Sequence, residues 1–185
     1  FFISDIHGYH KNITFGVRQW KPKDGCRNFT NEVEMTEHIA SNINEKVKRD
    51  DILINLGDWS FNGVDKISKL REMINCETII LLLGNHDLKI QKNLEYQKLF
   101  TRVMFYNEFR YNKTLVCQMH YPLGSWNEIG RGAWCIHGHT HSNYKANGKI
   151  LDVGVDGNNF YPWHIYDIER YMSQRPIIKV DHHNS

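Results

Sequence analysis

Short apolar runs that end in small polar clusters organise the first half of the chain. Residues 1–4, 52–56 and 78–83 form such runs and predict three buried strands. Their hydrophobicity is continuous rather than alternating, which is typical of strands covered on both faces of a sheet. Apolar residues at every fourth position over 35–47 predict an amphipathic helix, and 64–74 predict a second one. The order strand, helix, strand, helix, strand indicates an α/β unit.

The first predicted helix has a clear start signal. Asn31 is followed three residues later by Glu34, which resembles a capping box, and the helix is expected to end near Arg49. The polar stretch 8–30 ahead of it is expected to be irregular.

The second half of the chain is richer in strands. Its apolar runs are short, with Asn147-Gly148 as a turn signal before the last of them, and a final helix is expected over 167–173. These patterns predict two sheets packed face to face with helices outside. The four predicted strands cover 103–110, 115–119, 133–136 and 150–153.

Composition narrows the class of protein. The chain has 185 residues, 41% of them hydrophobic and 24% charged, as expected for one globular domain over 1–185. The net charge is only +2, far from the excess of clustered lysine and arginine that is typical of duplex-DNA binders, so we expect no strong duplex nucleic-acid binding. No apolar run approaches the length of a membrane span, and we expect no membrane partner.

The four cysteines favour neither a zinc ribbon nor a disulfide framework. They are far apart and form no Cys-x-x-Cys pair. Cys76 and Cys117 border or lie in apolar runs, so we expect buried free thiols there. No signal peptide precedes Phe1, which together with the thiols predicts a cytoplasmic protein, in the host cell if the protein is viral.

Polar side chains with metal-binding chemistry follow five consecutive predicted strands. In open α/β sheets, ligands bind beyond the carboxyl ends of the strands, so these clusters are expected to build one site. A lone histidine or a Gly-Asp turn is most often structural, but five such clusters make coincidence a poor explanation. Mixed carboxylate and imidazole donors suit Mn, Fe or Zn better than Ca. The clusters are Asp5-Ile6-His7, Gly57-Asp58, Gly84-Asn85-His86-Asp87, His120 and Gly138-His139-Thr140-His141.

In this order the clusters resemble the calcineurin-like metallophosphoesterase superfamily, whose pattern is D-x-H, G-D-x-x-D, G-N-H-D/E, a lone H and G-H-x-H. The resemblance runs from Asp5 to His141, about three quarters of the chain. The motifs also look like those of a small bacterial and phage branch of predicted phosphoesterases. The resemblance implies an α/β (α+β) fold with two mixed β-sheets packed as a sandwich and flanked by helices.

The resemblance also implies a role for each cluster. Two divalent metal ions would be bound, with Mn²⁺ the first choice and Fe, Zn, Ni or Mg as alternatives. A water activated between them would attack a phosphate ester, and His86 would protonate the leaving oxygen as general acid. Asp58 would bridge the ions. One ion would be held by Asp5, His7 and His141, and the other by Asn85, His120 and His139.

One residue departs from the family pattern. Phe61 stands where the family has the second Asp of G-D-x-x-D, an Asp that in many relatives orients the catalytic His. The metal ligands are untouched by this change, but the partner that orients His86 is left open, with Asp87 or Ser60 as substitutes.

Further residues beside the motifs are candidates for substrate contacts. His10 follows the first cluster closely, and Arg131 and Lys89 could clamp a phosphate, while surface or structural roles fit each of them as well. Four aromatic residues could stack a nucleobase or, more often at such positions, seal the core. They are Trp59, Phe61, Tyr121 and Trp126.

The leading functional hypothesis is hydrolysis of phosphodiesters, with a nucleotide as one candidate substrate. Phosphomonoester hydrolysis is the nearest alternative. Diesters are favoured because a short chain suggests an open site and because Phe61 replaces the Asp typical of protein phosphatase sites. A non-catalytic metal-binding interaction scaffold is the alternative from another class, but such relatives usually lose ligands that are all present here. A nuclease with direct DNA recognition lacks the basic patch that it needs.

Overall fold

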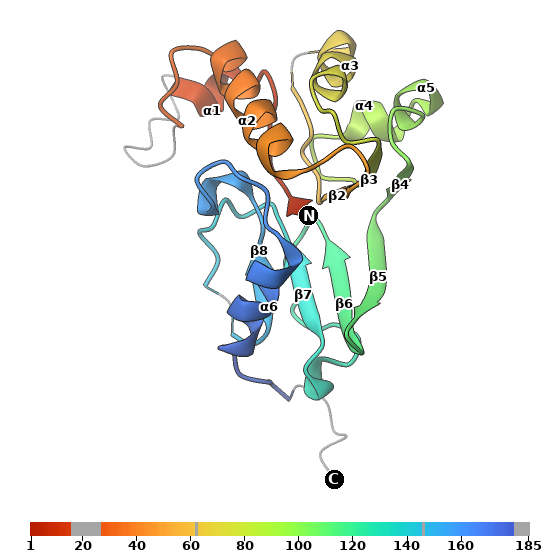
Figure 1. The fold of residues 1–185 in the computed structure, drawn as a ribbon, viewed down its shortest axis with the longest axis vertical. Helices are drawn as coiled ribbons and strands as arrows, with labels where there is room; N and C mark the ends of the chain where they lie inside the picture. Colours follow the sequence, from red (N-terminus) through yellow and green to blue (C-terminus); the bar gives the residue numbers. More distant parts are fainter. Residues whose placement is uncertain (16–26, 62, 146, 180–185) are drawn as a thin grey trace.

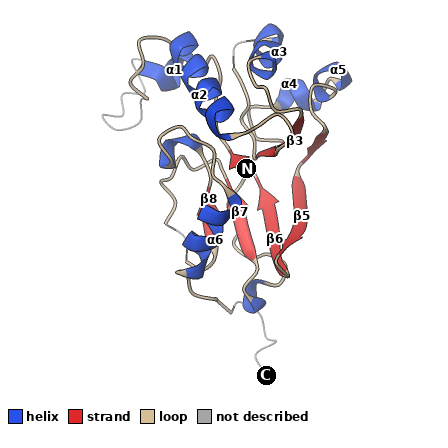
Figure 2. Cartoon of the chain, viewed as in Figure 1, coloured by secondary structure: helices blue, strands red, loops and turns tan. Residues whose placement is uncertain are grey.

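Two four-stranded β-sheets form the centre of the protein, and helices lie outside them (Figures 1 and 2). The first sheet has the order β1-β2-β3-β4, with every neighbouring pair of strands parallel. Its strands are β1 (Phe2–Ile3), β2 (Ile52–Asn55), β3 (Thr78–Leu82) and β4 (Arg102–Met104). This computed structural model describes residues 1–15, 27–61, 63–145 and 147–179.

The second sheet has the order β5-β6-β7-β8. The β5–β6 pair is antiparallel, whereas β6–β7 and β7–β8 are parallel, so this sheet is mixed. The predicted α/β sandwich flanked by helices is therefore confirmed. The strands are β5 (Tyr106–Tyr111), β6 (Thr114–Met119), β7 (Trp134–His137) and β8 (Ile150–Asp152).

The helices complete two hydrophobic layers. One core cluster joins the first sheet to the helices beside it, through residues such as Ile39 of α2 and Leu81 of β3. A second cluster lies between the sheets, where Leu82 and Ile136 meet Ile168 of α6. The α-helices are α1 (Lys11–Phe15), α2 (Glu32–Lys46), α3 (Val64–Glu72), α4 (Leu88–Gln91), α5 (Leu94–Gln97) and α6 (Ile165–Ser173), with the 3₁₀ helices η1 (Ile129–Arg131) and η2 (Val155–Gly157).

The predicted start of α2 is confirmed at the level of single hydrogen bonds. Asn31 Oδ1 accepts from the N–H groups of Val33 and Glu34, both at 2.9 Å. The Glu34 carboxylate accepts from the N–H of Thr30 at 2.8 Å, one residue before the cap. These bonds satisfy backbone donors that the first turn of a helix leaves free. The helix ends at Lys46, three residues earlier than predicted.

The strand predicted over 103–110 is wrong as a single strand. The chain crosses from one sheet to the other at Phe105: β4 pairs with β3, and β5 pairs with β6. No glycine or proline in 102–111 marks this change of partner. The stretch 8–30 also contains a helix, α1, where irregular structure was expected, and α4 and α5 were not predicted.

Three cysteines are described, and all are buried and free. Cys76 and Cys117 agree with the prediction, and Cys135 joins them. Cys26 lies outside the described residues. Within those residues, no helix combines the length and apolar character needed to cross a membrane.

Candidate metal centre

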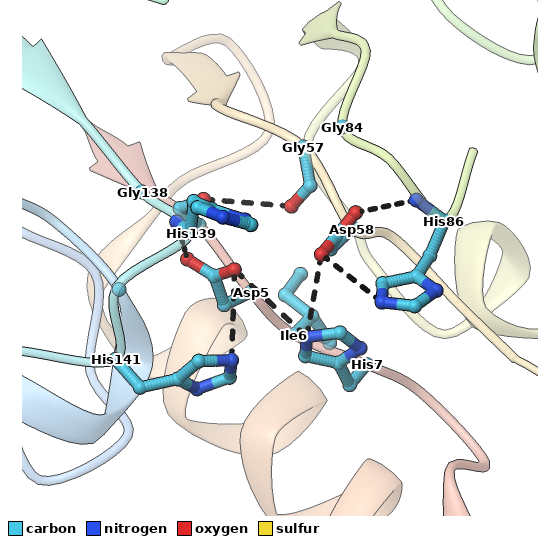
Figure 3. A network of polar contacts seen from close by, with 12 residues as sticks. Asp5, Ile6, His7, Gly57, Asp58, Gly84, His86, Gly138, His139 and His141 are labelled. Carbon is cyan, nitrogen blue, oxygen red and sulfur yellow. Dashed lines mark hydrogen bonds and ion pairs between the residues drawn. The ribbon is translucent and has the colours of Figure 1, made fainter. Parts of the chain in front are cut away.

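The loops after the strands are tied to one another at one edge of the sheets. The N–H of Asp5 donates to the carbonyl of Gly57 at 3.0 Å, and the N–H of His7 donates to the carbonyl of Asp58 at 2.9 Å. In the second sheet, Gly138 donates to the carbonyl of His120 at 2.9 Å. The five predicted clusters therefore meet in space, with Asp5 and Asp58 facing the surrounding histidines (Figure 3).

An unusual backbone conformation marks these loops. Five candidate ligands have a positive φ, between 48° and 71°, although none of them is glycine. Such a conformation costs of order 1–3 kcal/mol at each residue and persists only where the surrounding structure enforces it. The hydrogen bonds between the loops supply that enforcement. The five residues are Asp5, His7, Asp58, His139 and His141.

The first group of ligand atoms gathers around Asp5. Its Oδ1 lies 3.8 Å from Nε2 of His7 and 4.0 Å from Nε2 of His141. Asp5 and His7 are buried, and His141 is partly exposed. These three side chains could hold one metal ion, and they are the three predicted for it.

The second group gathers around Asp58 and His120. Nε2 of His120 lies 3.5 Å from Oδ2 of Asp58 and 3.0 Å from Oδ1 of Asn85. His139 completes the group and is exposed. The same Asp58 oxygen lies 3.5 Å from Nε2 of His7, so it stands between the two groups, as expected of a bridging ligand.

The donor atoms fit cations. Asp5 Oδ1 and both ring nitrogens of His7 are buried without a hydrogen-bond partner among the described residues. His120 Nδ1 donates to the carbonyl of Leu56 at 2.7 Å, so in the neutral ring its Nε2 carries a lone pair that faces Asn85 Oδ1. Two lone pairs aimed at each other, beside buried and unpaired donors, are stabilised by a metal ion between them.

The pKa values of these groups follow from burial. Desolvation raises the pKa of Asp5 to about 7; the charge of His141 opposes this effect, and Asp152 and Asp58 add to it. Burial also lowers the pKa of His7 well below its usual range and lowers that of His120. A bound cation favours the carboxylate and the neutral imidazole, so it would keep Asp5 ionised and make it a good ligand.

His86 stands beside the two groups rather than in either of them. Its side chain is 40% exposed, and its Nε2 lies 4.0 Å from Asp58 Oδ2. Its backbone N–H donates to Asp58 Oδ1 at 2.9 Å. The His86 ring packs against Phe61 with centroids 4.8 Å apart, and Phe61 stacks on His10 at 3.7 Å. Aromatic packing therefore stands where the family pattern has a carboxylate.

Neither Asp87 nor Ser60, the two substitutes considered for orienting His86, forms a hydrogen bond or ion pair with its ring in the described part of the chain. The buried carboxylate of Asp87 instead accepts from the backbone N–H groups of Asp58, Trp59 and Gly84, at 2.8, 3.0 and 2.9 Å. Ser60 Oγ is buried without a hydrogen-bond partner among the described residues. Asp87 thus holds the backbone on which Asp58 sits.

The remaining sequence-predicted residues divide into two sets. His10 lines a cavity of about 170 Å³ together with His86 and ligands of both groups, and Lys89 lines a neighbouring cavity on the other side of His86. Arg131 is not brought to the site: it lies in η1, ahead of β7, whereas the Gly138 cluster follows the opposite end of that strand (Figure 1). Among the aromatics, Trp59 and Trp126 are buried.

Sequence reasoning missed a carboxylate that contacts a ligand. Asp156, in η2, accepts from Nδ1 of His141 at 2.7 Å, which leaves Nε2 of that ring free for a metal. Burial acts to raise the pKa of Asp156, but the bond from His141 and the charge of Arg27 outweigh it and hold the pKa well below its usual range. The sequence could have pointed to Asp156, because it closely follows the predicted strand 150–153, and ligands bind beyond the carboxyl ends of such strands.

We expect Gly138→Ala to destabilise the fold and to disturb the metal centre. A Cβ at residue 138 would lie 2.6 Å from Asp5 Oδ2 and would collide with the Ser4 hydroxyl. Overpacking of this kind costs about 1–3 kcal/mol of unfolding free energy, which thermal denaturation measures as a lower Tm. Gly124→Ala is the matched control, because no heavy atom lies within 4 Å of its Cβ. Equal Tm and equal Mn²⁺ affinity for the two variants would contradict the prediction.

Similarity to known proteins agrees with the geometry. The family model for calcineurin-like phosphoesterases matches residues 1–185. An uncharacterized protein of Methanocaldococcus jannaschii is 29% identical over 189 residues, which cover 97% of this chain and 94% of that protein. The crystal structure of a protein of unknown function from Aquifex aeolicus has a similar fold, with a TM-score of 0.67, 24% identity and coverage of 92% and 97% of the two chains. The chain belongs to the calcineurin-like phosphoesterase family.

Proposed function

We propose that this protein hydrolyses phosphate esters at a dinuclear metal centre, with phosphodiesters preferred to monoesters. One observation carries the proposal: Asp58 Oδ2 lies 3.5 Å from Nε2 of His7 and 3.5 Å from Nε2 of His120. A single carboxylate oxygen between two groups of side chains that could each hold a metal ion is the arrangement that two neighbouring cations need. We further propose Mn²⁺ as the native metal, since the donors mix carboxylate, imidazole and carboxamide groups.

The roles of the residues follow from their placement. When bound, the two cations would neutralise charge on the phosphate and lower the pKa of an attacking water. Asp5, His7 and His141 would hold one cation, and Asn85, His120 and His139 the other. Asp58 would contact both.

His86 would serve as the proton donor to the leaving oxygen. Its ring lines the same cavity as ligands of both groups, yet it belongs to neither group. Its backbone bond to Asp58 Oδ1 and the packing of its ring on Phe61 hold it beside the position of the phosphate. A histidine in this place can pass a proton to an alkoxide as the P–O bond breaks.

The charge of the cavity favours diesters. Among the described residues that line it, none is lysine or arginine. A monoester carries up to two negative charges on a terminal phosphate, which the metals alone would have to balance. A diester carries one negative charge. Its second ester substituent, which stays attached to the phosphate, can extend into solvent on the exposed side where His86 and His139 lie. His10, whose neutral ring lines this cavity, is the proposed substrate contact.

The test compares two nitrophenyl esters. The protein is stripped of metal with a chelator, Mn²⁺ is restored, and hydrolysis of bis(p-nitrophenyl) phosphate is followed beside that of p-nitrophenyl phosphate. We expect turnover that depends on Mn²⁺ and a higher kcat/KM for the diester. Faster hydrolysis of the monoester would make the protein a phosphomonoesterase. Tight Mn²⁺ binding with no hydrolysis of either ester would favour the interaction scaffold instead.

We also propose a cytoplasmic place of action. The support is chemical: Cys76, Cys117 and Cys135 are buried and free, as is typical of proteins in a reducing compartment.

A further inference from the structure

A buried arginine contacts the backbone that carries the first metal ligands. The side chain of Arg27 is only 2% exposed. Its Nη2 donates to the carbonyl of Asp5 at 2.6 Å, and its Nη1 donates to the carbonyl of Ile6 at 2.8 Å. Asp5 and His7, on either side of Ile6, both have the left-handed backbone that needs outside support.

The same guanidinium also reaches a third ligand through a carboxylate. Nε and Nη2 of Arg27 donate to the two oxygens of Asp156, each at 2.8 Å, in a bidentate pair. Asp156 in turn accepts from Nδ1 of His141 at 2.7 Å. One side chain therefore fixes the backbone of Asp5 and His7 and the ring orientation of His141.

The other group of ligands has supports of its own that do not include Arg27. His120 is oriented by the carbonyl of Leu56, and the backbone of Asp58 is held by Asp87. The side-chain hydrogen bonds of Arg27 within the described chain go to Asp5, Ile6, Asp156 and the sulfur of Met35, and none goes to Asn85, His120 or His139.

We propose that Arg27, acting through Asp156, is a positioning residue for one metal position alone, the one formed by Asp5, His7 and His141. The proposal rests on the metal binding included in the proposed function and not on the hydrolytic step. Partners of this kind, which contact the ligands rather than the metal, are typically worth 10–100-fold in metal affinity.

A buried ion pair alone would not require this arrangement. Arg27 also donates hydrogen bonds to the Asp5 and Ile6 carbonyls, and a salt bridge with Asp156 requires neither of these two bonds. Without the guanidinium, these carbonyls would be left with unmet hydrogen bonds, and the partly exposed Asp156 carboxylate would keep only its bond from His141, so both could shift. The first metal position would lose its geometry, while the supports of the second would remain.

The test measures metal binding without substrate. Apo protein is titrated with Mn²⁺ by calorimetry, and bound metal is counted after dialysis, for wild type, Arg27→Met and Asp156→Asn. We expect two Mn²⁺ per wild-type chain. In both variants one Mn²⁺ should bind with unchanged affinity and the other roughly 10–100-fold more weakly. Arg27→Lys keeps the positive charge but not the planar, bidentate guanidinium. Its affinity for the weakened Mn²⁺ should lie between those of wild type and Arg27→Met.

A matched control separates positioning from general stability. Arg71 is a partly buried arginine that also donates to backbone carbonyls, those of Leu99, Ile74 and Cys76, away from the metal centre. Arg71→Met should lower Tm yet leave both Mn²⁺ affinities unchanged. If Arg27→Met fails to fold, the isosteric Asp156→Asn supplies the same comparison.

Double variants assign the weakened position. In a His141→Ala background, which has already lost a ligand of the first position, Arg27→Met should not weaken the Mn²⁺ that still binds tightly, whereas in a His120→Ala background its full effect should persist. Equal affinities for Arg27→Met and wild type, or an equal loss at both positions, would overturn the proposal.

The wild-type protein separates this proposal from the proposed function. Wild type that binds two Mn²⁺ but hydrolyses no ester would contradict the proposed function and leave the positioning role of Arg27 standing. Wild type that binds no Mn²⁺ would overturn both.

Discussion

Asp58→Asn is expected to reduce Mn²⁺-dependent hydrolysis by roughly 1,000-fold or more. Metals at such a site contribute several kcal/mol of transition-state stabilisation, and each 1.36 kcal/mol is a factor of ten in rate. The carboxamide removes the charge from the one oxygen that lies 3.5 Å from both His7 Nε2 and His120 Nε2. Both Mn²⁺ affinities should therefore fall together, which no other single substitution in the site is expected to cause.

The substitution should leave the fold intact. Asp58 has φ 56°, and asparagine accepts this left-handed conformation more readily than most residues. The carboxamide oxygen can still accept from the His86 N–H that donates to Asp58 Oδ1 in the wild type.

Steady-state kinetics with bis(p-nitrophenyl) phosphate and Mn²⁺ calorimetry would check the prediction. Asp51→Asn, at a carboxylate that caps the Lys48 N–H, is the control. Near-wild-type kcat in Asp58→Asn would refute the bridging role.

The convergence of the ligands could be predicted because it follows from sheet topology. Asp5, Asp58 and Asn85 each come directly after or soon after an apolar run, and parallel strands bring their carboxyl ends to one edge. The division of ligands between two ions could not be obtained from spacing alone. It came from the family resemblance and stays a prediction, although Asp5, His7 and His141 gather in one group that could hold an ion, and Asp58, His120 and His139 in another.

Other features depend on contacts between distant parts of the chain. The crossing between sheets at Phe105 depends on which strand lies beside each half of 102–111, and no glycine or proline in that stretch marks it. Arg27 is separated from Asp156 by 129 positions, and nothing near it in sequence marks a metal-supporting role. Helices of four residues, such as α4 and α5, are too short to show a period.

Phe61, which stands where the family pattern has an Asp, determines how His86 is held. Phe61 contributes an aromatic face, itself backed by the His10 ring, in place of a hydrogen-bond acceptor. The ring of His86 is thus restrained by packing on one side and lies 4.0 Å from Asp58 Oδ2 on the other. A general acid needs a defined position near the leaving oxygen, and packing can supply it.

His86→Ala is expected to slow hydrolysis by an amount that depends on the leaving group. General acid catalysis contributes typically 10²–10⁴-fold, so a dinucleotide, whose leaving group is an alkoxide, should lose roughly that much. Nitrophenolate leaves without a proton, and bis(p-nitrophenyl) phosphate should lose far less. Both Mn²⁺ ions should still bind, because His86 belongs to neither group of ligands. Chromatography of dinucleotide products beside the nitrophenolate assay measures the two losses. Equal losses would mean that His86 binds substrate and does not donate the proton.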